Sequence, residues 1–236
     1  MSIYVFDLDG TLTPARLPMT DDFAVKFVPW LKQNKAYIAS GSNLPKVIEQ
    51  MGKKVMNEFC GIYCSMGNEF WAKGEYVYQN DFTPDAEFVA RLEYFRARTD
   101  YPYTLYDNYI ERRTGMINFS VLGRNCPYEE RLRYQAWDNI HHERETIQRQ
   151  LLAEFPQYEV YVGGSISMDI VPLGCSKAQV AHRLREKYPE EEILFFGDKT
   201  FAGGNDYELA QALRAMDNTK VIQVSGPDEV AEYLKI

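Results

Sequence analysis

The stretch of sequence that decides the fold is Ile3-Tyr4-Val5-Phe6-Asp7-Leu8-Asp9-Gly10-Thr11, near the N-terminus. Its apolar run predicts a short strand that is buried on both faces, as in a parallel sheet. Because side chains alternate along an extended chain, Asp7 and Asp9 point to the same side where this strand ends. Two carboxylates so close repel each other unless a cation or a shared proton compensates, and carboxylate oxygens are ligands that Mg²⁺ prefers. The stretch therefore predicts a metal site, although an Asp-Gly pair alone is also typical of a surface turn.

A buried strand that leads into small or acidic residues recurs twice along the chain. Ala36-Tyr37-Ile38-Ala39 leads into Ser40-Gly41-Ser42, and Ile193-Leu194-Phe195-Phe196 leads into Gly197-Asp198. The carboxyl ends of parallel strands meet at one edge of a sheet, which is where ligands bind. We therefore expect the three strand ends to form a single site.

Phosphate ligands are predicted at the same edge. Either Ser40 or Ser42, in a turn that opens a helix, could offer its hydroxyl and backbone amides to a phosphoryl group. Lys177, at the start of a later helix, could supply a cation to the same phosphate. The residue types therefore indicate chemistry on a phosphate.

The pattern of elements divides the chain into two domains. Residues 1–80 and 173–236 alternate apolar strands with amphipathic helices, as a parallel sheet with crossover helices does. Residues 81–172 mix helices with hairpin-like strands, which is typical of an antiparallel sheet. The predicted fold is α/β, with a parallel-sheet core interrupted by an inserted α+β cap that contains an antiparallel sheet and helices.

Within the cap, the spacing predicts one long amphipathic helix over residues 128–155. Residues 109–122 alternate like strands around a tight turn at Thr114-Gly115. In the later strand Ile166-Ser167-Met168-Asp169-Ile170, the apolar residues face one way and Ser167 and Asp169 face the other. This alternation predicts a polar sheet face opposite an apolar one.

Composition excludes several functional classes. The chain has 236 residues and a net charge of −8, which argues against general binding of nucleic acid or anionic membranes. It lacks a run of about 18 apolar residues and an N-terminal export signal. Its four cysteines are scattered, which is typical of reduced thiols. We therefore expect a cytoplasmic protein without nucleic-acid or membrane partners.

These motifs together resemble those of the haloacid dehalogenase superfamily. The matching features are Asp7-Leu8-Asp9-Gly10-Thr11, the hydroxyl residue after the next strand, Lys177 and Gly197-Asp198. In phosphotransferases of that superfamily the first aspartate is a nucleophile, and the aspartate two residues later is a general acid/base. The resemblance implies these roles for Asp7 and Asp9, a catalytic Lys177, and Mg²⁺ held by Asp7, the backbone carbonyl of Asp9, and Asp198.

Longer segments are similar to the eukaryotic-type phosphomannomutases. They cover nearly the whole chain and include residues 7–16, 115–118, 123–126, 163–169, 196–200 and 203–206. In that family the sugar and its non-reacting phosphate contact cap arginines, a core arginine and a polar cap strand. The resemblance implies that the substrate-binding residues are Arg16, Ser42 (or Ser40), Arg113, Arg124, Arg131, Ser167 and Asp169.

The resemblance implies an isomerase of sugar phosphates. It would interconvert mannose 6-phosphate and mannose 1-phosphate through an aspartyl-phosphate, with a hexose 1,6-bisphosphate as intermediate and activator. It would act in GDP-mannose biosynthesis and form a homodimer through the cap domains. The alternatives are a Mg²⁺-dependent sugar-phosphate phosphatase on the same scaffold and a non-catalytic sugar-phosphate-binding regulator, which the presence of all the predicted catalytic residues disfavours.

Three departures from the family pattern concern the hinge and the rim of the site. Cys175-Ser176 precede Lys177 where the family usually has Trp-Asp, Ser165 replaces a usual Gln, and Ser65-Met66-Gly67 replaces a Glu-Asn-Gly turn. They leave the preference between mannose and glucose open and bear less on the phosphoryl chemistry.

Overall fold

The computed structural model describes residues 2–14 and 17–236, which form two compact units. The first combines the chain up to Asn80 with Cys175–Ile236, and the second is Asp81–Gly174. The chain thus returns to the first unit at Cys175, slightly later than the predicted boundary at residue 173. Arg16, predicted to bind substrate, lies outside the described residues. No helix in the described part of the chain is both long and apolar enough to cross a membrane.

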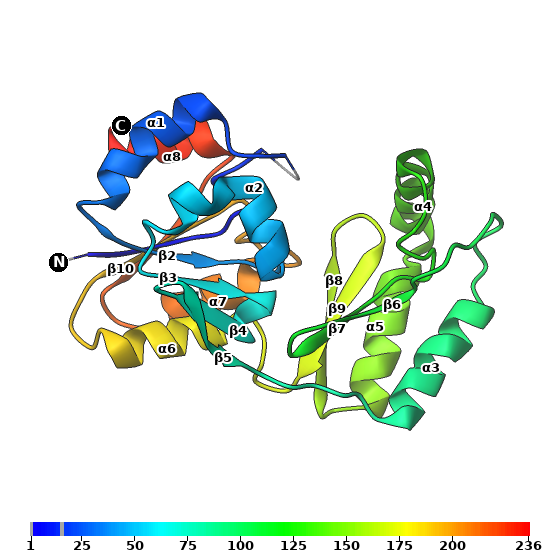
Figure 1. The fold of residues 1–236 in the computed structure, drawn as a ribbon. Helices are drawn as coiled ribbons and strands as arrows, with labels where there is room; N and C mark the ends of the chain where they lie inside the picture. The colour runs from blue at the N-terminus through cyan, green and yellow to red at the C-terminus, as the bar shows by residue number, and fades with distance from the viewer. Residues whose placement is uncertain (1, 15–16) are drawn as a thin grey trace. The chain divides into compact units, whose positions relative to one another are not determined.

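The first unit is built on a seven-stranded sheet, shown in Figure 1. The strand order is β11-β10-β1-β2-β3-β4-β5. Neighbours from β11 to β3 pair in parallel, whereas β3–β4 and β4–β5 pair antiparallel. The strands are β1 (Ile3–Phe6), β2 (Lys35–Ala39), β3 (Gly61–Cys64), β4 (Glu69–Ala72), β5 (Glu75–Gln79), β10 (Ile193–Gly197) and β11 (Thr219–Gln223). The parallel core confirms the predicted α/β class. The antiparallel β4–β5 hairpin extends the sheet beyond β3.

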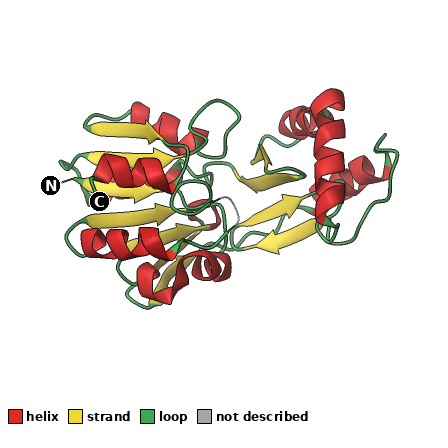
Figure 2. Ribbon diagram, turned by 90° about the horizontal axis from the view of Figure 1, so that it is seen from above, coloured by secondary structure: helices red, strands yellow, loops and turns green. Residues whose placement is uncertain are grey.

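Helices cover both faces of this sheet. They are α1 (Asp21–Leu31), α2 (Leu44–Met56), α6 (Gln179–Lys187), α7 (Tyr207–Arg214) and α8 (Pro227–Leu234), with a short 3₁₀ turn at Ser65–Gly67. Side chains of α1, α2 and α8 pack on one face, and those of α6 and α7 pack on the other. Figure 2 shows by colour how helices flank the strands.

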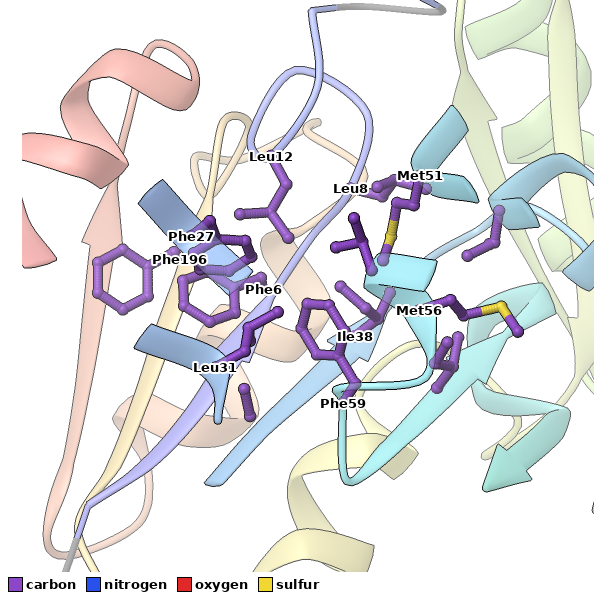
Figure 3. Close-up of a cluster of buried hydrophobic side chains, with 14 of the residues drawn as sticks. Phe6, Leu8, Leu12, Phe27, Leu31, Ile38, Met51, Met56, Phe59 and Phe196 are labelled. Carbon is purple, nitrogen blue, oxygen red and sulfur yellow. The ribbon is translucent and has the colours of Figure 1, made fainter. Parts of the chain in front are cut away.

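The core fixes the loop that follows β1. Phe6 stacks on Phe196 of the neighbouring strand, with ring centroids 4.9 Å apart. Leu8 and Leu12, which lie beyond the strand, are fully buried in the same cluster, as Figure 3 shows. Each such side chain contributes about 1.5–3 kcal/mol of burial free energy. Burial of Leu8 and Leu12 therefore holds in place the segment that carries Asp7 and Asp9.

The second unit is a four-stranded antiparallel sheet with helices on one face. The strand order is β6-β7-β9-β8, and the elements are α3 (Ala86–Ala97), β6 (Ile110–Arg113), β7 (Met116–Phe119), α4 (Tyr128–His141), α5 (Glu143–Glu154), β8 (Tyr158–Gly163) and β9 (Ser167–Pro172). Ile117 and Met168 of the sheet pack with Phe88 and Leu151 of the helices. The tight turn joins β6 to β7, and Gly115 there has a φ of +66°, which glycine adopts readily. The opposite face of the sheet carries polar residues.

The prediction of one long helix over residues 128–155 is wrong. The chain forms two helices, α4 and α5, separated by His142 in the left-handed conformation (φ +52°). The buried carboxylate of Asp138 accepts the backbone N–H of Arg144 and pairs with its Nε at 2.7 Å, which caps the second helix. Two apolar residues of the predicted stripe, Leu132 and Ile140, are exposed. Helical spacing continued across the break, so periodicity could not reveal it.

Candidate active site

The end of β1 delivers Asp7 to a buried cluster of charges. The backbone N–H of Asp7 donates to the carbonyl of Phe196 across the parallel pair, at 2.9 Å. Lys177 Nζ donates to Asp7 Oδ1 at 2.7 Å and to Asp206 Oδ1 at 2.5 Å. All three charged side chains are at most 2% exposed. The structure thus brings the predicted residues Asp7 and Lys177 together, and it adds Asp206.

A third carboxylate completes a group that could hold a cation. Carboxylate oxygens of Asp7, Asp198 and Asp206 lie within 4.8 Å of one another, the one such group among the described residues. Asp7 Oδ2 and Asp198 Oδ1 are buried and have no hydrogen-bond partner in the described chain. Because buried carboxylate oxygens without partners are costly, and hard oxygen ligands suit Mg²⁺, these residues fit a divalent cation.

Two glycines permit this close approach of acids. Gly10 has a φ of +93°, and a Cβ there would lie 2.6 Å from Asp198 Oδ2. A Cβ on Gly197 would lie 2.4 Å from Asp206 Oδ2. Any side chain at these positions would therefore displace a carboxylate. This is the physical reason why glycine follows Asp9 and precedes Asp198.

Burial and repulsion set the electrostatics of the cluster. Burial, and then the Asp206 carboxylate, raise the pKa of Asp7 above its ordinary value, although Lys177 opposes the shift. Burial lowers the pKa of Lys177, but Asp206 and Asp7 together raise it above its ordinary value. Burial also raises the pKa of Asp198, against the effect of Lys199, whose Nζ lies 3.3 Å from Asp198 Oδ2. The ammonium group stays charged, and the excess of carboxylates favours a cation.

Asp9 does not belong to the group of three carboxylates. Its half-buried side chain accepts a hydrogen bond at Oδ1 from Gln50 Nε2, at 3.1 Å. Gln50 is buried on α2 and also lies 3.4 Å from Thr13 Oγ1. The sequence reasoning missed Gln50, whose only signal was a polar residue within the apolar stripe of that helix.

The two candidate serines differ in exposure. Ser40 is buried, and its Oγ accepts the backbone N–H of Ser42 at 3.0 Å. Ser42 is half-buried, and its carbonyl accepts the backbone N–H of Ser65. The Ser40 hydroxyl thus shapes the turn, which leaves Ser42 as the more accessible hydroxyl.

A second charged cluster lies on the helix-free face of the second unit's sheet. Arg124 donates through one terminal nitrogen to Asn118 Oδ1 at 2.8 Å and to Ser167 Oγ at 3.0 Å. Asn118 Nδ2 donates to Asp169 Oδ1 at 2.6 Å, and Arg131 donates to the backbone carbonyl of Arg124. The predicted residues Arg124, Arg131, Ser167 and Asp169 therefore lie together, joined through Asn118.

Arg113 joins the same cluster through Glu111. Arg113 Nε and Nη2 donate to Glu111 Oε2 at 2.9 and 2.5 Å, and Arg124 Nε lies 3.0 Å from the same oxygen. Arg113 Nη1 lies 3.8 Å from Asp169 Oδ1. Burial, and then repulsion from Arg113, lower the pKa of Arg124, and burial raises that of Asp169. The sequence reasoning left Glu111 out, although strand alternation places it on the face of Arg113.

The two clusters suit complementary tasks. Buried carboxylates with a lysine can activate a nucleophile and stabilise a phosphoryl group, whereas converging arginines bind an anion. The family model described as eukaryotic phosphomannomutase matches residues 26–235. The chain belongs to this family.

Curated phosphomannomutases match along almost their whole length. The phosphomannomutase of Dendrobium officinale is 33% identical over 242 residues, covering 99% of this chain and 93% of the relative. That of Saccharomyces cerevisiae is also 33% identical, over 246 residues, covering 99% and 92%. As a member of the phosphomannomutase family, the chain is an enzyme.

Solved structures establish the fold of this phosphomannomutase family member. A haloacid dehalogenase-like hydrolase from Bacteroides thetaiotaomicron aligns with a TM-score of 0.60 and 18% identity, covering 99% of this chain and 98% of that one. An N-terminally truncated IMP-nucleotidase from Plasmodium falciparum aligns with a TM-score of 0.68 and 16% identity, covering 100% and 69%. At these identities the likeness concerns the fold, which is haloacid dehalogenase-like as predicted.

Proposed function

We propose that this enzyme interconverts mannose 6-phosphate and mannose 1-phosphate, in a Mg²⁺-dependent cycle primed by a hexose 1,6-bisphosphate. The observation that carries the proposal is the buried cluster at the end of β1, where Asp7 is held by Lys177 beside two further carboxylates. Membership of the phosphomannomutase family supports the choice of substrate.

Asp7 acts as the nucleophile in this proposal. Its carboxylate attacks a phosphate of the bisphosphate, so that an aspartyl-phosphate forms and the bond to the sugar oxygen breaks. Asp9 protonates the leaving oxygen and later removes the proton from the accepting hydroxyl. Gln50, bonded to Asp9 Oδ1, orients that carboxylate for both transfers.

Lys177 and the acids manage charge during transfer. Lys177 stays protonated and places its charge beside Asp7, where negative charge builds on the phosphoryl oxygens. Asp206 fixes the position of Lys177 at 2.5 Å. Asp7, Asp198 and the carbonyl of Asp9 would hold Mg²⁺, which supplies charge neutralisation when bound. Ser42 binds oxygens of the transferring group.

The second unit recognises the rest of the substrate. Arg113, Arg124 and Arg131 bind the non-reacting phosphate, and Ser167 and Asp169 bind sugar hydroxyls. The intermediate bisphosphate must be held by either phosphate for the cycle to close, which is why three arginines suit a mutase. A phosphatase, the alternative, uses the same acids but requires only one bound phosphate.

Product analysis separates the two activities. With mannose 1-phosphate, Mg²⁺ and a saturating hexose 1,6-bisphosphate, we expect formation of mannose 6-phosphate to exceed phosphate release by at least about tenfold, a barrier difference near 1.4 kcal/mol. Inorganic phosphate appearing faster than the isomeric sugar phosphate would instead assign the enzyme as a phosphatase. A glucose 1-phosphate arm measures the preference between the two sugars.

We further propose a cytoplasmic homodimer that associates through the second unit. The family resemblance supports the dimer, and the free thiols of all four cysteines agree with a reducing compartment. Sedimentation of the full chain should give the mass of two copies. A monomer at micromolar concentration would contradict this expectation.

A further inference from the structure

Glu111 links two of the arginines on the polar face of the second unit. Its Oε2 atom accepts two N–H groups from Arg113, at 2.9 and 2.5 Å, and Arg124 Nε lies 3.0 Å away. The two guanidinium groups repel each other, and this repulsion adds to the larger effect of burial in lowering the pKa of Arg124. A single carboxylate oxygen between them is therefore what allows both to lie side by side.

Arg113 depends on Glu111 more than Arg124 does. Within the described residues, the side-chain hydrogen bonds of Arg113 both go to Glu111, and its contact with Asp169 is a 3.8 Å ion pair. Arg124 is held independently by Asn118 and Ser167. Loss of the Glu111 carboxylate would thus free Arg113 first.

Strand register places Glu111 in a row of polar neighbours. Glu111 stands opposite Asn118 in the β6–β7 pair, and Asn118 stands opposite Asp169 in the β7–β9 pair. Arg113 follows Glu111 by two residues on the same strand, so both side chains share one face. The row therefore reaches from Asp169, the proposed sugar ligand, to the edge strand that carries Arg113.

We propose that Glu111 is a positioning residue for phosphate recognition, which rests on the function proposed above. It pairs Arg113 with Arg124 and leaves Nη1 of Arg113 and Nη2 of Arg124 to bind the non-reacting phosphate. Its own negative charge does not reverse the attraction, because three arginines outnumber the carboxylates of Glu111 and Asp169 on this face. The ordering of Arg113, which would otherwise be flexible, favours phosphate binding more than the negative charge of Glu111 opposes it.

The test uses Glu111→Gln, which keeps the size and one acceptor oxygen, together with Glu111→Ala. Glu154→Gln is the matched control, because it breaks the ion pair of Glu154 with Arg91 on the helices of the same unit. We expect both Glu111 variants to weaken binding of glucose 1,6-bisphosphate and raise KM for mannose 1-phosphate about tenfold, with kcat changed less than about threefold. Dephosphorylation of acetyl phosphate, which has no distal phosphate, should stay at the wild-type rate.

Three outcomes would overturn the proposal. Tighter bisphosphate binding by Glu111→Gln would show that the carboxylate competes with phosphate. Equal losses with acetyl phosphate and the sugar phosphate, or wild-type binding in both variants, would show a structural role or none. Circular dichroism of Glu111→Gln reports whether the unit folds. Binding of the bisphosphate is measured without Mg²⁺, so that no phosphoryl group is transferred, and a failure of the mutase assignment in the wild-type product analysis remains distinguishable.

Discussion

The two charged clusters of this enzyme carry excess charge of opposite sign. In the cluster that contains Lys177, oxygens of three carboxylates lie within 4.8 Å of one another, so negative charge is in excess. On the polar face of the second unit, Arg113, Arg124 and Arg131 outnumber the carboxylates that touch them. Each cluster thus lacks the counter-charge that its proposed ligand would bring, a divalent cation in the first and a phosphate in the second.

The clusters also differ in how firmly they are held. Asp7, Lys177 and Asp206 are essentially inaccessible, whereas the side chains of Arg113 and Arg124 are 15% and 24% exposed. Removing one member of a buried, strongly interacting cluster has a large effect, whereas a partly exposed arginine face distributes its binding energy over several groups. Substitutions should therefore have larger effects in the first cluster.

The largest effect is expected from Asp7→Asn. Removing the nucleophile should abolish covalent phosphorylation and reduce turnover by more than roughly 10⁴-fold, as loss of a catalytic nucleophile does. Asp9→Asn should reduce turnover about 10²-fold. Because the pKa of Asp7 is raised by burial, its neutral replacement should not lower the melting temperature. Asp22→Asn, exposed on α1, is the control. Normal turnover in Asp7→Asn would disprove the nucleophile assignment.

Lys177→Met tests whether charge balance stabilises the first cluster. The variant leaves the carboxylates of Asp7 and Asp206 buried without their cation, so we expect a loss of about 3–5 kcal/mol in unfolding free energy. Added Mg²⁺ should stabilise this variant more than the wild type. Urea titrations with and without Mg²⁺ measure both effects. Lys220→Met, which removes an exposed ion pair with Glu192, should cost at most about 1 kcal/mol.

If Lys177→Met and Lys220→Met lowered the unfolding free energy equally, burial would not make the ion pairs of Lys177 more important for stability than the exposed pair of Lys220. If Mg²⁺ stabilised neither protein, the three carboxylates would not bind the cation.

Removal of Arg124 tests the second cluster. Arg124→Ala should weaken binding of glucose 1,6-bisphosphate by about 1.5–3 kcal/mol, the range of a charge-assisted hydrogen bond, and affect acetyl phosphate less. Arg113→Ala and Arg131→Ala should behave alike. Titration calorimetry measures the affinity. Arg112→Ala, an exposed neighbour on β6, is the control. Equal losses with both phosphoryl donors would place these arginines in support of the fold.

The smallest effect is expected from Asp169→Asn and concerns pH. Burial raises the pKa of Asp169 above 3.8 in the folded protein, so folding favours its protonated form. Its contribution to stability is present below the unfolded-state pKa and is lost as the pH rises through the folded-state pKa. Asp169→Asn should lack this loss, so its stability relative to the wild type should increase as the pH rises past about 4. Urea midpoints between pH 3 and 7 measure the difference, and parallel curves for the two proteins would contradict the shift.

Local sequence patterns predicted much of the fold. The apolar run before Asp7 and its counterpart before Asp198 predicted buried parallel strands, and both are found in neighbouring positions of one sheet. Thr114-Gly115 predicted the β6–β7 turn. These features depend on alternation and on backbone freedom over a few residues, which a sequence displays directly. The same alternation predicted that Ser167 and Asp169 share a face.

The sequence by itself determined which chemical groups reach the ends of the strands, and the tertiary structure alone decided which partners hold them. Asp206 bonds to Lys177 across 29 positions of chain, Gln50 bonds to Asp9 across 41, and Glu111 lies against Arg124. The break at His142 likewise follows from the pairing of Asp138 with Arg144. Each of these contacts arises because packing brings together side chains from different elements, and their geometry depends on distances and burial that no local periodicity encodes.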